Sequence, residues 1–312
     1  MMSTILHLLA LLFLLCGGVQ VGAAETAPPV TVIRFAPDGQ SCVAGSQAGL
    51  VQYAWPSLTR LRHFDVDVEN IHDMRFSPDG AVLAVAGGIP AVEGRVAFFE
   101  WPSGVSVHLS SDHDDAIMGI AWRNNQQFAS AGLDRRLLTC RFADGFGVIR
   151  QFNGHSRGVT TVTWLDSLLV SAGIDQSLRV WDTRTGQVVR TLNNHTQRVN
   201  QIARRPGKHA LPMVASASDD RTVRFWQPTI GRLVRFVKLS SVPLDLAWLP
   251  TGATLVVATA DGYVHAVDPD TARLMISRMA VDGRAYSIAA APDGRHVAVG
   301  GRHGQIRCVR LE

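Results

Sequence analysis

The chain has 312 residues, of which 46% are hydrophobic and 18% charged, and its formal net charge is +4. This composition is ordinary for a globular protein, and without low-complexity tracts or charge runs it excludes a largely disordered or fibrous chain. Of the 30 basic residues only Lys208 and Lys238 are lysines, and the arginines are dispersed along the sequence, which indicates a GC-rich bacterial genome rather than a nucleic-acid partner.

The first predicted element is an export signal at the N-terminus. Ile5 to Cys16 is almost uninterrupted hydrocarbon, and Val21 to Ala24 supply small residues where a signal peptidase could cut, just before Glu25. We therefore expect residues 1–24 to be a signal peptide. Residues 25–312 would be the mature protein, located in the periplasm or outside the cell.

Two alternatives to a cleaved signal stay open. Met1 to His7 contains no Lys or Arg, so the segment could be an uncleaved anchor, although its apolar run is shorter than the roughly 20 residues that span a bilayer. A lipid on Cys16 is also conceivable, but Leu15 is larger than the small residue expected before a lipidated cysteine. The cleaved signal fits the segment better than either.

One pattern recurs seven times between about Val30 and Arg310. Each copy has a short apolar strand, a turn like Pro-Asp-Gly, a second strand with small residues, a polar turn and a third strand. The residue two places before the first turn is, in chain order, Phe35, Phe76, Trp122, Trp164, Arg204, Trp248 and Ala290, so by subtraction the copies are 40 to 46 residues apart. A strand-rich period of this length predicts four-stranded propeller blades.

Four side-chain types recur at matching places in the central copies. They are His155, Ser171, Asp175 and Trp181 in the fourth copy, His195, Ser216, Asp220 and Trp226 in the fifth, and His113, Ser130 and Asp134 in the third, where Cys140 replaces the Trp. This pattern resembles the WD-repeat β-propeller family. The resemblance implies an all-β, seven-bladed WD-repeat-like β-propeller. It also implies that these side chains form buried hydrogen-bonded networks with a structural role.

Closure of the ring leaves a question at the last blade. The pattern starts with a first strand, Val30 to Phe35, and ends with a third strand, Gln305 to Arg310, so the final blade lacks its outer strand. The resemblance implies that the N-terminus supplies it, but Pro28 and Pro29 cannot donate ladder hydrogen bonds. Either the last blade has three strands and an exposed edge that invites association, or Gly18 to Ala23 is retained and pairs there.

The expected function is binding of a protein partner through loops. The resemblance places six arginines in turns of one face, usually called the top, where they could meet an acidic partner: Arg135, Arg157, Arg198, Arg221, Arg284 and Arg302. The second copy expands its turn into a loop, Gly87 to Gly94, that would offer Ile89, Pro90 and Val92 to a partner. We expect a monomeric, non-catalytic scaffold without cofactor, metal or nucleic acid.

An exported hydrolase or lyase is the alternative function. The sequence has no HExxH, haem-attachment or Gly-x-Ser-x-Gly motif, so a catalytic site would have to assemble from separate copies in the axial channel. One equivalent first-strand position could face that channel, occupied by Asp73, Gly119, Thr161, Gln201, Asp245 and Ser287. Its two carboxylates could hold a calcium ion through water, but we expect solvated channel residues rather than a metal site.

The cysteines of the mature chain show no metal-binding spacing. Cys42, Cys140 and Cys308 all fall in predicted strands, which predicts buried, inert thiols. Since the first and last blades meet when the ring closes, a bridge between Cys42 and Cys308 is an alternative.

Overall fold

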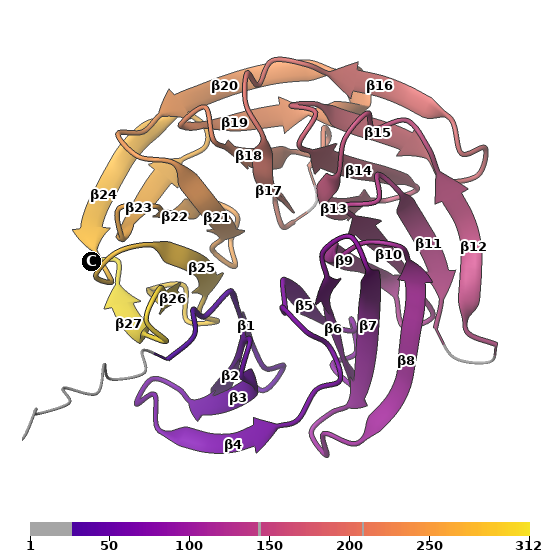
Figure 1. Cartoon of the computed structure of the whole chain (residues 1–312). Coiled ribbons are helices and arrows are strands. Elements are labelled where there is room, and N and C mark those ends of the chain that lie inside the picture. The colour runs from indigo at the N-terminus through magenta and orange to yellow at the C-terminus, as the bar shows by residue number, and fades with distance from the viewer. Residues whose placement is uncertain (1–26, 143–144, 208) are drawn as a thin grey trace, which may run out of the picture.

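The computed structural model describes residues 27–142, 145–207 and 209–312, which form a ring of seven antiparallel sheets (Figure 1). Six sheets have four strands and the last has three. This confirms the predicted seven-bladed WD-repeat-like β-propeller, including the three-stranded last blade. The expected signal peptide, and the Gly18 to Ala23 segment that could pair with the last blade, lie outside the described residues.

Each blade runs in sequence order from the axis outward (Figure 1). Blade 1 contains β1 (Val32–Phe35), β2 (Ser41–Ser46), β3 (Gly49–Ala54) and β4 (Arg60–Phe64). Blade 2 contains β5 (Asp73–Phe76), β6 (Val82–Ile89), β7 (Glu93–Glu100) and β8 (Ser106–His113). Blade 3 contains β9 (Ile117–Asn124), β10 (Gln127–Gly132), β11 (Leu137–Arg141) and β12 (Gly147–Phe152). Blade 4 contains β13 (Val159–Leu165), β14 (Leu168–Gly173), β15 (Leu178–Asp182) and β16 (Val188–Leu192).

The remaining blades follow the same order. Blade 5 contains β17 (Val199–Arg204), β18 (Val214–Ser218), β19 (Thr222–Gln227) and β20 (Arg232–Lys238), with a single 3-10 turn at Pro228–Ile230. Blade 6 contains β21 (Pro243–Trp248), β22 (Leu255–Thr259), β23 (Tyr263–Asp268) and β24 (Arg273–Met279). Blade 7 contains β25 (Ala285–Ala290), β26 (His296–Gly301) and β27 (Ile306–Arg310). No helix in the described part of the chain is long and apolar enough to cross a membrane.

In the three copies where the residue before the first turn is tryptophan, this residue connects neighbouring blades. The indole of Trp122 donates to the carbonyl of Arg75 at 3.1 Å, and that of Trp164 donates to the carbonyl of Ala121 at 3.0 Å. The indole of Trp248 likewise donates to a backbone carbonyl of blade 5. Each indole therefore satisfies its N–H in the inner strand of the preceding blade while its ring packs between the sheets.

The Pro-Asp-Gly turns also interlock around the ring. Gly39 and Gly80 have φ values of +68° and +76°, which only glycine adopts without strain. A Cβ on Gly80 would lie 2.6 Å from Pro37 of blade 1, and one on Gly39 would lie 3.0 Å from Pro292 of blade 7. Glycine at these turns thus allows the proline of the previous blade to pack closely, even where blade 1 meets blade 7.

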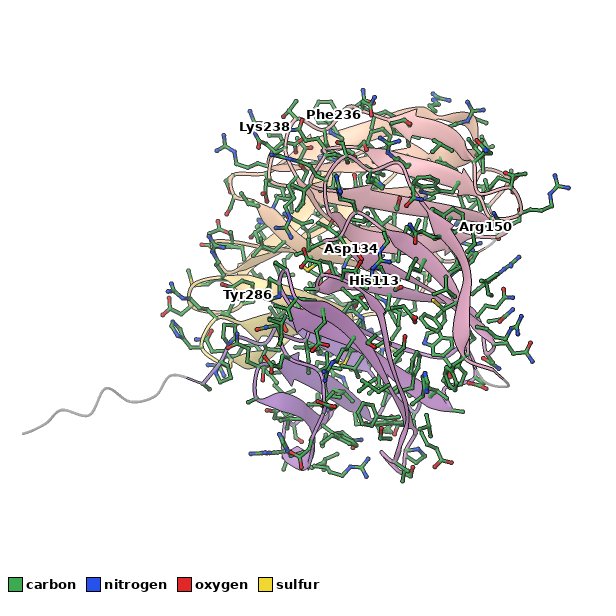
Figure 2. All side chains as sticks on the ribbon, turned by 45° about the vertical axis from the view of Figure 1, so that its right-hand side comes forward. His113, Asp134, Arg150, Phe236, Lys238 and Tyr286 are labelled. Carbon is green, nitrogen blue, oxygen red and sulfur yellow. The ribbon has the colours of Figure 1, made fainter. Side chains whose placement is uncertain are left out.

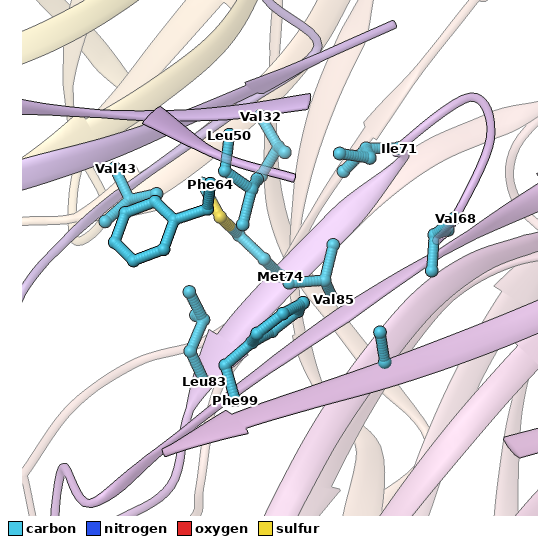
Figure 3. Close-up of a cluster of buried hydrophobic side chains, with 11 residues drawn as sticks. Val32, Val43, Leu50, Phe64, Val68, Ile71, Met74, Leu83, Val85 and Phe99 are labelled. Carbon is cyan, nitrogen blue, oxygen red and sulfur yellow. The ribbon is translucent and has the colours of Figure 1, made fainter. Parts of the chain in front are cut away.

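The outer strands face solvent and the hydrophobic core lies between the sheets. On β20 and β12, Phe236, Lys238 and Arg150 project from the rim of the ring (Figure 2). Between blades 1 and 2, by contrast, Phe64 meets Met74 and its neighbours in one buried cluster (Figure 3). Because each interface is such a cluster, the core is divided among neighbouring pairs of blades.

Packing closes the ring at blade 7. Ile33 and Cys42 of blade 1 are fully buried in one cluster with Ala298 of blade 7. Cys42, Cys140 and Cys308 are all free, so the alternative bridge between Cys42 and Cys308 is not formed. Cys42 and Cys140 are buried as predicted, but the prediction is wrong for Cys308, which is half-buried on the last strand of the three-stranded blade. Burial raises the pKa of Cys42 to about 12, which keeps this thiol neutral at physiological pH.

Candidate functional site

A chain of hydrogen bonds joins four side chains of blade 4. The indole N–H of Trp181 donates to Ser171 Oγ at 2.8 Å, and Ser171 Oγ lies 2.7 Å from His155 Nε2. His155 Nδ1 lies 3.0 Å from the carboxylate of Asp175. Since an indole nitrogen only donates, the serine hydroxyl is free to donate to Nε2, and Nδ1–H then donates to the carboxylate. Each of these four side chains therefore has a hydrogen-bond partner within the network.

The same network recurs in blade 5 and, incompletely, in blade 3. In blade 5, Ser216 Oγ accepts from Trp226 at 2.8 Å and lies 2.7 Å from His195 Nε2, while His195 Nδ1 lies 2.7 Å from Asp220. His113, at the end of β8, lies 2.9 Å from Asp134 and 2.9 Å from Ser130, both of blade 3. Figure 2 labels His113 and Asp134. Cys140 provides no indole there, so the blade 3 network has three members of this pattern.

Histidine contacts shift the titration of the network carboxylates. Burial alone would raise the pKa of Asp134, but hydrogen bonding and charge from His113 and Arg136 outweigh it and lower the pKa to about 2. In Asp220 burial is likewise outweighed by Thr222 and His195, and the pKa is again about 2. The pKa of Asp175 shifts in the same direction. Burial lowers the pKa of His195, so its ring is neutral at pH 7.

These shifts predict acid sensitivity. The lowered pKa values of Asp134 and Asp220 stabilise the fold fully above the ordinary carboxylate value near pH 4, and that contribution is lost as the pH falls through about 2. We expect the free energy of unfolding, measured by urea titration, to fall by about 2 kcal/mol for each carboxylate between pH 5 and pH 2. Asp220→Asn should flatten this decline, and an unchanged slope in that variant would contradict the assignment.

The networks also define one face of the ring. His113 ends an outer strand, whereas Asp134 lies in the turn between the second and third strands of the next blade. These turns and the loops that lead into each inner strand therefore lie at the same end of every blade, which we call the loop face. The other face carries the Pro-Asp-Gly turns.

All six arginines predicted to bind a partner lie in segments of the loop face. Arg135, Arg221 and Arg302 occupy turns between second and third strands, and Arg157, Arg198 and Arg284 occupy loops before inner strands. Among the described residues none of the six has a carboxylate within 4.0 Å, although their neighbours Arg136, Arg179 and Arg224 all do. Five are exposed and Arg198 is half-buried. We call these six residues the arginine set.

The loop predicted over Gly87 to Gly94 in blade 2 is instead the end of a β-hairpin, because β6 extends to Ile89 and β7 begins at Glu93. β6 and β7 continue to pair through Gly88 with Gly94 and Ile89 with Glu93. A Cβ on Gly88 would lie only 2.2 Å from the carbonyl of Glu93, so glycine permits this close pairing. The tip carries Pro90 and Val92, which are exposed, whereas Ile89 is half-buried.

The carboxylates expected to face the axial channel instead connect blades. Asp73 Oδ1 accepts from its own strand at Met74 N and from Arg34 at 2.7 Å, and Asp73 Oδ2 accepts from Ile120 N of blade 3 at 3.2 Å. Arg75 lies 3.4 Å from the same carboxylate. The arginines that pair with Asp73 were missed from the sequence, where their spacing gave no sign of convergence.

Equivalent positions repeat this inter-blade bond. Asp245 of blade 6 accepts from Leu246 N and from Ile288 N of blade 7, both within 2.9 Å, and Thr161 contacts Gln201 of blade 5. In each aspartate both carboxylate oxygens thus accept hydrogen bonds from the protein itself. This argues against the calcium site considered from the sequence. Burial raises the pKa of Asp245.

Comparison with known proteins agrees with this geometry. Residues 146–182 and 186–227 match the family described as "WD domain, G-beta repeat". Over 182 residues, 58% of this chain and 36% of the relative, the chain is 26% identical to the B-type cell cycle switch protein ccs52B of Medicago truncatula. It is 24% identical to protein transport protein sec13 of Emericella nidulans over 180 residues, 49% and 58% of the two chains.

A third relative is THO complex subunit 3 of Arabidopsis thaliana, 30% identical over 125 residues, or 38% of this chain and 39% of the relative. The chain thus spans less than two thirds of the length of each of these relatives. The two matched segments run from β12, the outer strand of blade 3, to β19, the third strand of blade 5, and contain the two complete networks of Asp, His, Ser and Trp. With its seven sheets in one repeated strand order, the chain is a seven-bladed, WD-repeat-like β-propeller.

Proposed function

We propose that this protein is an exported, non-catalytic scaffold that binds a protein partner through its loop face. The observation that carries this proposal is the arginine set: six guanidinium groups in segments of one face, spread from blade 3 to blade 7, with no carboxylate within 4.0 Å in the described chain. Guanidinium groups without an internal partner are available to carboxylates of another molecule. An acidic protein surface is therefore the expected ligand.

The loop face also carries exposed carboxylates that would help to orient the partner. Asp114, Asp219, Asp261 and Asp282 lie among the arginines, and a further group lies at blades 1 and 2. The loop between β4 and β5 carries Asp65, Asp67 and Glu69, and the blade 2 hairpin carries Glu93. Arg95 pairs with Asp67 and Glu93, whereas Asp65 and Glu69 have no arginine within 4.0 Å among the described residues. Charges of both signs on the loop face would steer association and select one orientation of the partner.

Two observations support the proposal of a scaffold. The blades are rigid, and the names of two relatives refer to complexes. Buried networks and inter-blade bonds hold the strands, so the loops are displayed on a fixed ring, which is how propeller-like scaffolds present recognition surfaces. THO complex subunit 3 is named as a subunit of a complex, and "Cell division cycle 20.1, cofactor of APC complex" of Arabidopsis thaliana, 25% identical over 211 residues, is named as a cofactor of one. We propose that this chain is also a member of an assembly.

The test is recovery of a partner by a charge-reversed variant. Changing the arginine set to glutamate should weaken binding roughly 100-fold, since six surface charge contacts of about 0.5 kcal/mol each are lost. A matched control changes six exposed arginines outside the loop face: Arg60, Arg184, Arg232, Arg235, Arg273 and Arg307. Tagged full-length chains would be captured from separate envelope and cytoplasmic fractions of the producing cells.

Three results separate the possibilities. A protein recovered by the wild type and by the control variant, but lost with the arginine-set variant, supports the proposed face. Equal recovery by all three, or equal loss in both variants, contradicts it. Export is tested separately on the same material, because N-terminal sequencing should begin at Glu25 if residues 1–24 are removed, and an intact Met1 in the cytoplasmic fraction would contradict export.

A further inference from the structure

A cavity of about 210 Å³ opens on the rim of the ring between blades 2 and 3. Its lining includes Ser110 and Asp112 from the end of β8, and Phe128 and Cys140 from β10 and β11. Cys140 is buried, whereas Asp112 is exposed at the mouth. The cavity therefore reaches from solvent to a thiol inside the blade interface.

The position of Cys140 shows why this space is empty. Cys140 pairs across the sheet with Phe128, as Trp181 pairs with Leu169 in blade 4. Trp181 and its blade 5 equivalent Trp226 are completely buried. Blade 3 thus has a thiol where the next two blades have an indole.

The side of the cavity formed by blade 2 also carries a smaller side chain than the equivalent position of blade 3. In blade 3, Phe152 lies opposite Leu137 and its ring packs on Trp181 with centroids 5.7 Å apart. The equivalent residue of blade 2 is Ser110, which lies opposite Val96. Two large side chains that fill the interface of blades 3 and 4 are therefore both replaced by small ones at the interface of blades 2 and 3.

The aromatic side chains that line the cavity can pack against a flat ring. His108 and Phe146 stack with centroids 3.5 Å apart at 16°, and Phe128 lines the interior. Desolvation raises the pKa of Cys140 to about 12, so its thiol is a neutral, polarizable contact. An engineered apolar cavity of roughly 150 Å³ takes up benzene, so a cavity of 210 Å³ has room for an aromatic ring.

We propose that this cavity binds a planar aromatic ring of about the size of an indole. The ring would enter against Phe128 and Cys140, and an N–H or O–H group on it would donate to the carboxylate of Asp112. The ring could belong to a free small molecule or to the side chain of a peptide. This site is separate from the loop face and does not depend on the function proposed for it.

The test measures binding of indole and of N-acetyl-tryptophan amide to the full chain by ligand-observed NMR. Both should bind the wild type at millimolar concentrations or below. Cys140→Trp fills the cavity with the residue that blades 4 and 5 already hold, and should weaken indole binding at least about tenfold. Cys140→Ser preserves the space and should bind as the wild type does.

A second variant guards against a folding defect. Ser110→Phe fills the cavity from the opposite wall, as Phe152 does in blade 3, and should also weaken binding at least about tenfold. Binding of both ligands supports a peptide side chain as the source, and binding of indole alone supports a small molecule. The proposal is overturned if neither ligand binds up to its solubility limit, or if folded Cys140→Trp and Ser110→Phe bind indole like the wild type.

Discussion

Replacing Trp181 by alanine is expected to lower the free energy of unfolding by about 3–5 kcal/mol. The indole is completely buried between blades 3 and 4, where it packs on Phe152 and donates to Ser171. Removal leaves a cavity at the junction of two sheets and takes the indole donor from the network of Ser171, His155 and Asp175. Urea unfolding at pH 7 measures the loss directly.

Trp181→Phe separates packing from hydrogen bonding. Phenylalanine keeps most of the aromatic contact but has no N–H, so we expect a loss of about 1–2 kcal/mol for the missing hydrogen bond together with the smaller ring. The two variants should therefore differ by at least about 1 kcal/mol. A Trp181→Ala protein as stable as the wild type would show that the network does not hold these blades together.

Replacing Asp73 by alanine is expected to cost about 3–5 kcal/mol, because breaking a buried ion pair leaves its partner uncompensated. The Asp73 side chain is 5% exposed and lies 2.7 Å from Arg34 and 3.4 Å from Arg75. Its loss would also orphan the backbone N–H of Ile120 in blade 3. Thermal and urea unfolding would report the change.

Ser287 offers a matched control at the equivalent position of blade 7. Its hydroxyl is buried and has no hydrogen-bond partner among the described residues, so Ser287→Ala removes an unsatisfied polar group and should leave the protein at least as stable as the wild type. Both substitutions are made at the same place in the ring of inner strands. Equal effects of Asp73→Ala and Ser287→Ala would contradict a connecting role for Asp73.

The blade count could be predicted from the sequence because each blade repeats its own local signals. The Pro-Asp-Gly turns have glycine at the position where φ is positive, as at Gly39 and Gly80. The spacing of His, Ser, Asp and Trp also predicted a shared network, and the structure brings His155, Ser171 and Asp175 together. Such signals act within one blade or between adjacent blades, so a single repeat reveals them.

Contacts that depend on which residues two neighbouring copies carry, rather than on a signal that every copy repeats, were not predictable in the same way. Asp73 was interpreted as a channel residue because nothing in its own copy shows that it accepts a hydrogen bond from Ile120, 47 residues later. The cavity near Cys140 likewise needs a small residue at Ser110 in another blade. The blade 2 hairpin was misjudged because glycine usually marks a loop, whereas Gly88 here allows two strands to approach closely.

Amide hydrogen exchange on the full chain, with and without the captured partner, tests the central claim most directly. Binding by the loop face predicts new protection in the loops that carry Arg157, Arg198 and Arg284, and in the turns that carry Arg135 and Arg221. The Pro-Asp-Gly turns on the other face should exchange as before. Protection confined to those turns, or to the outer strands, would contradict a scaffold that binds its partner through the arginine set.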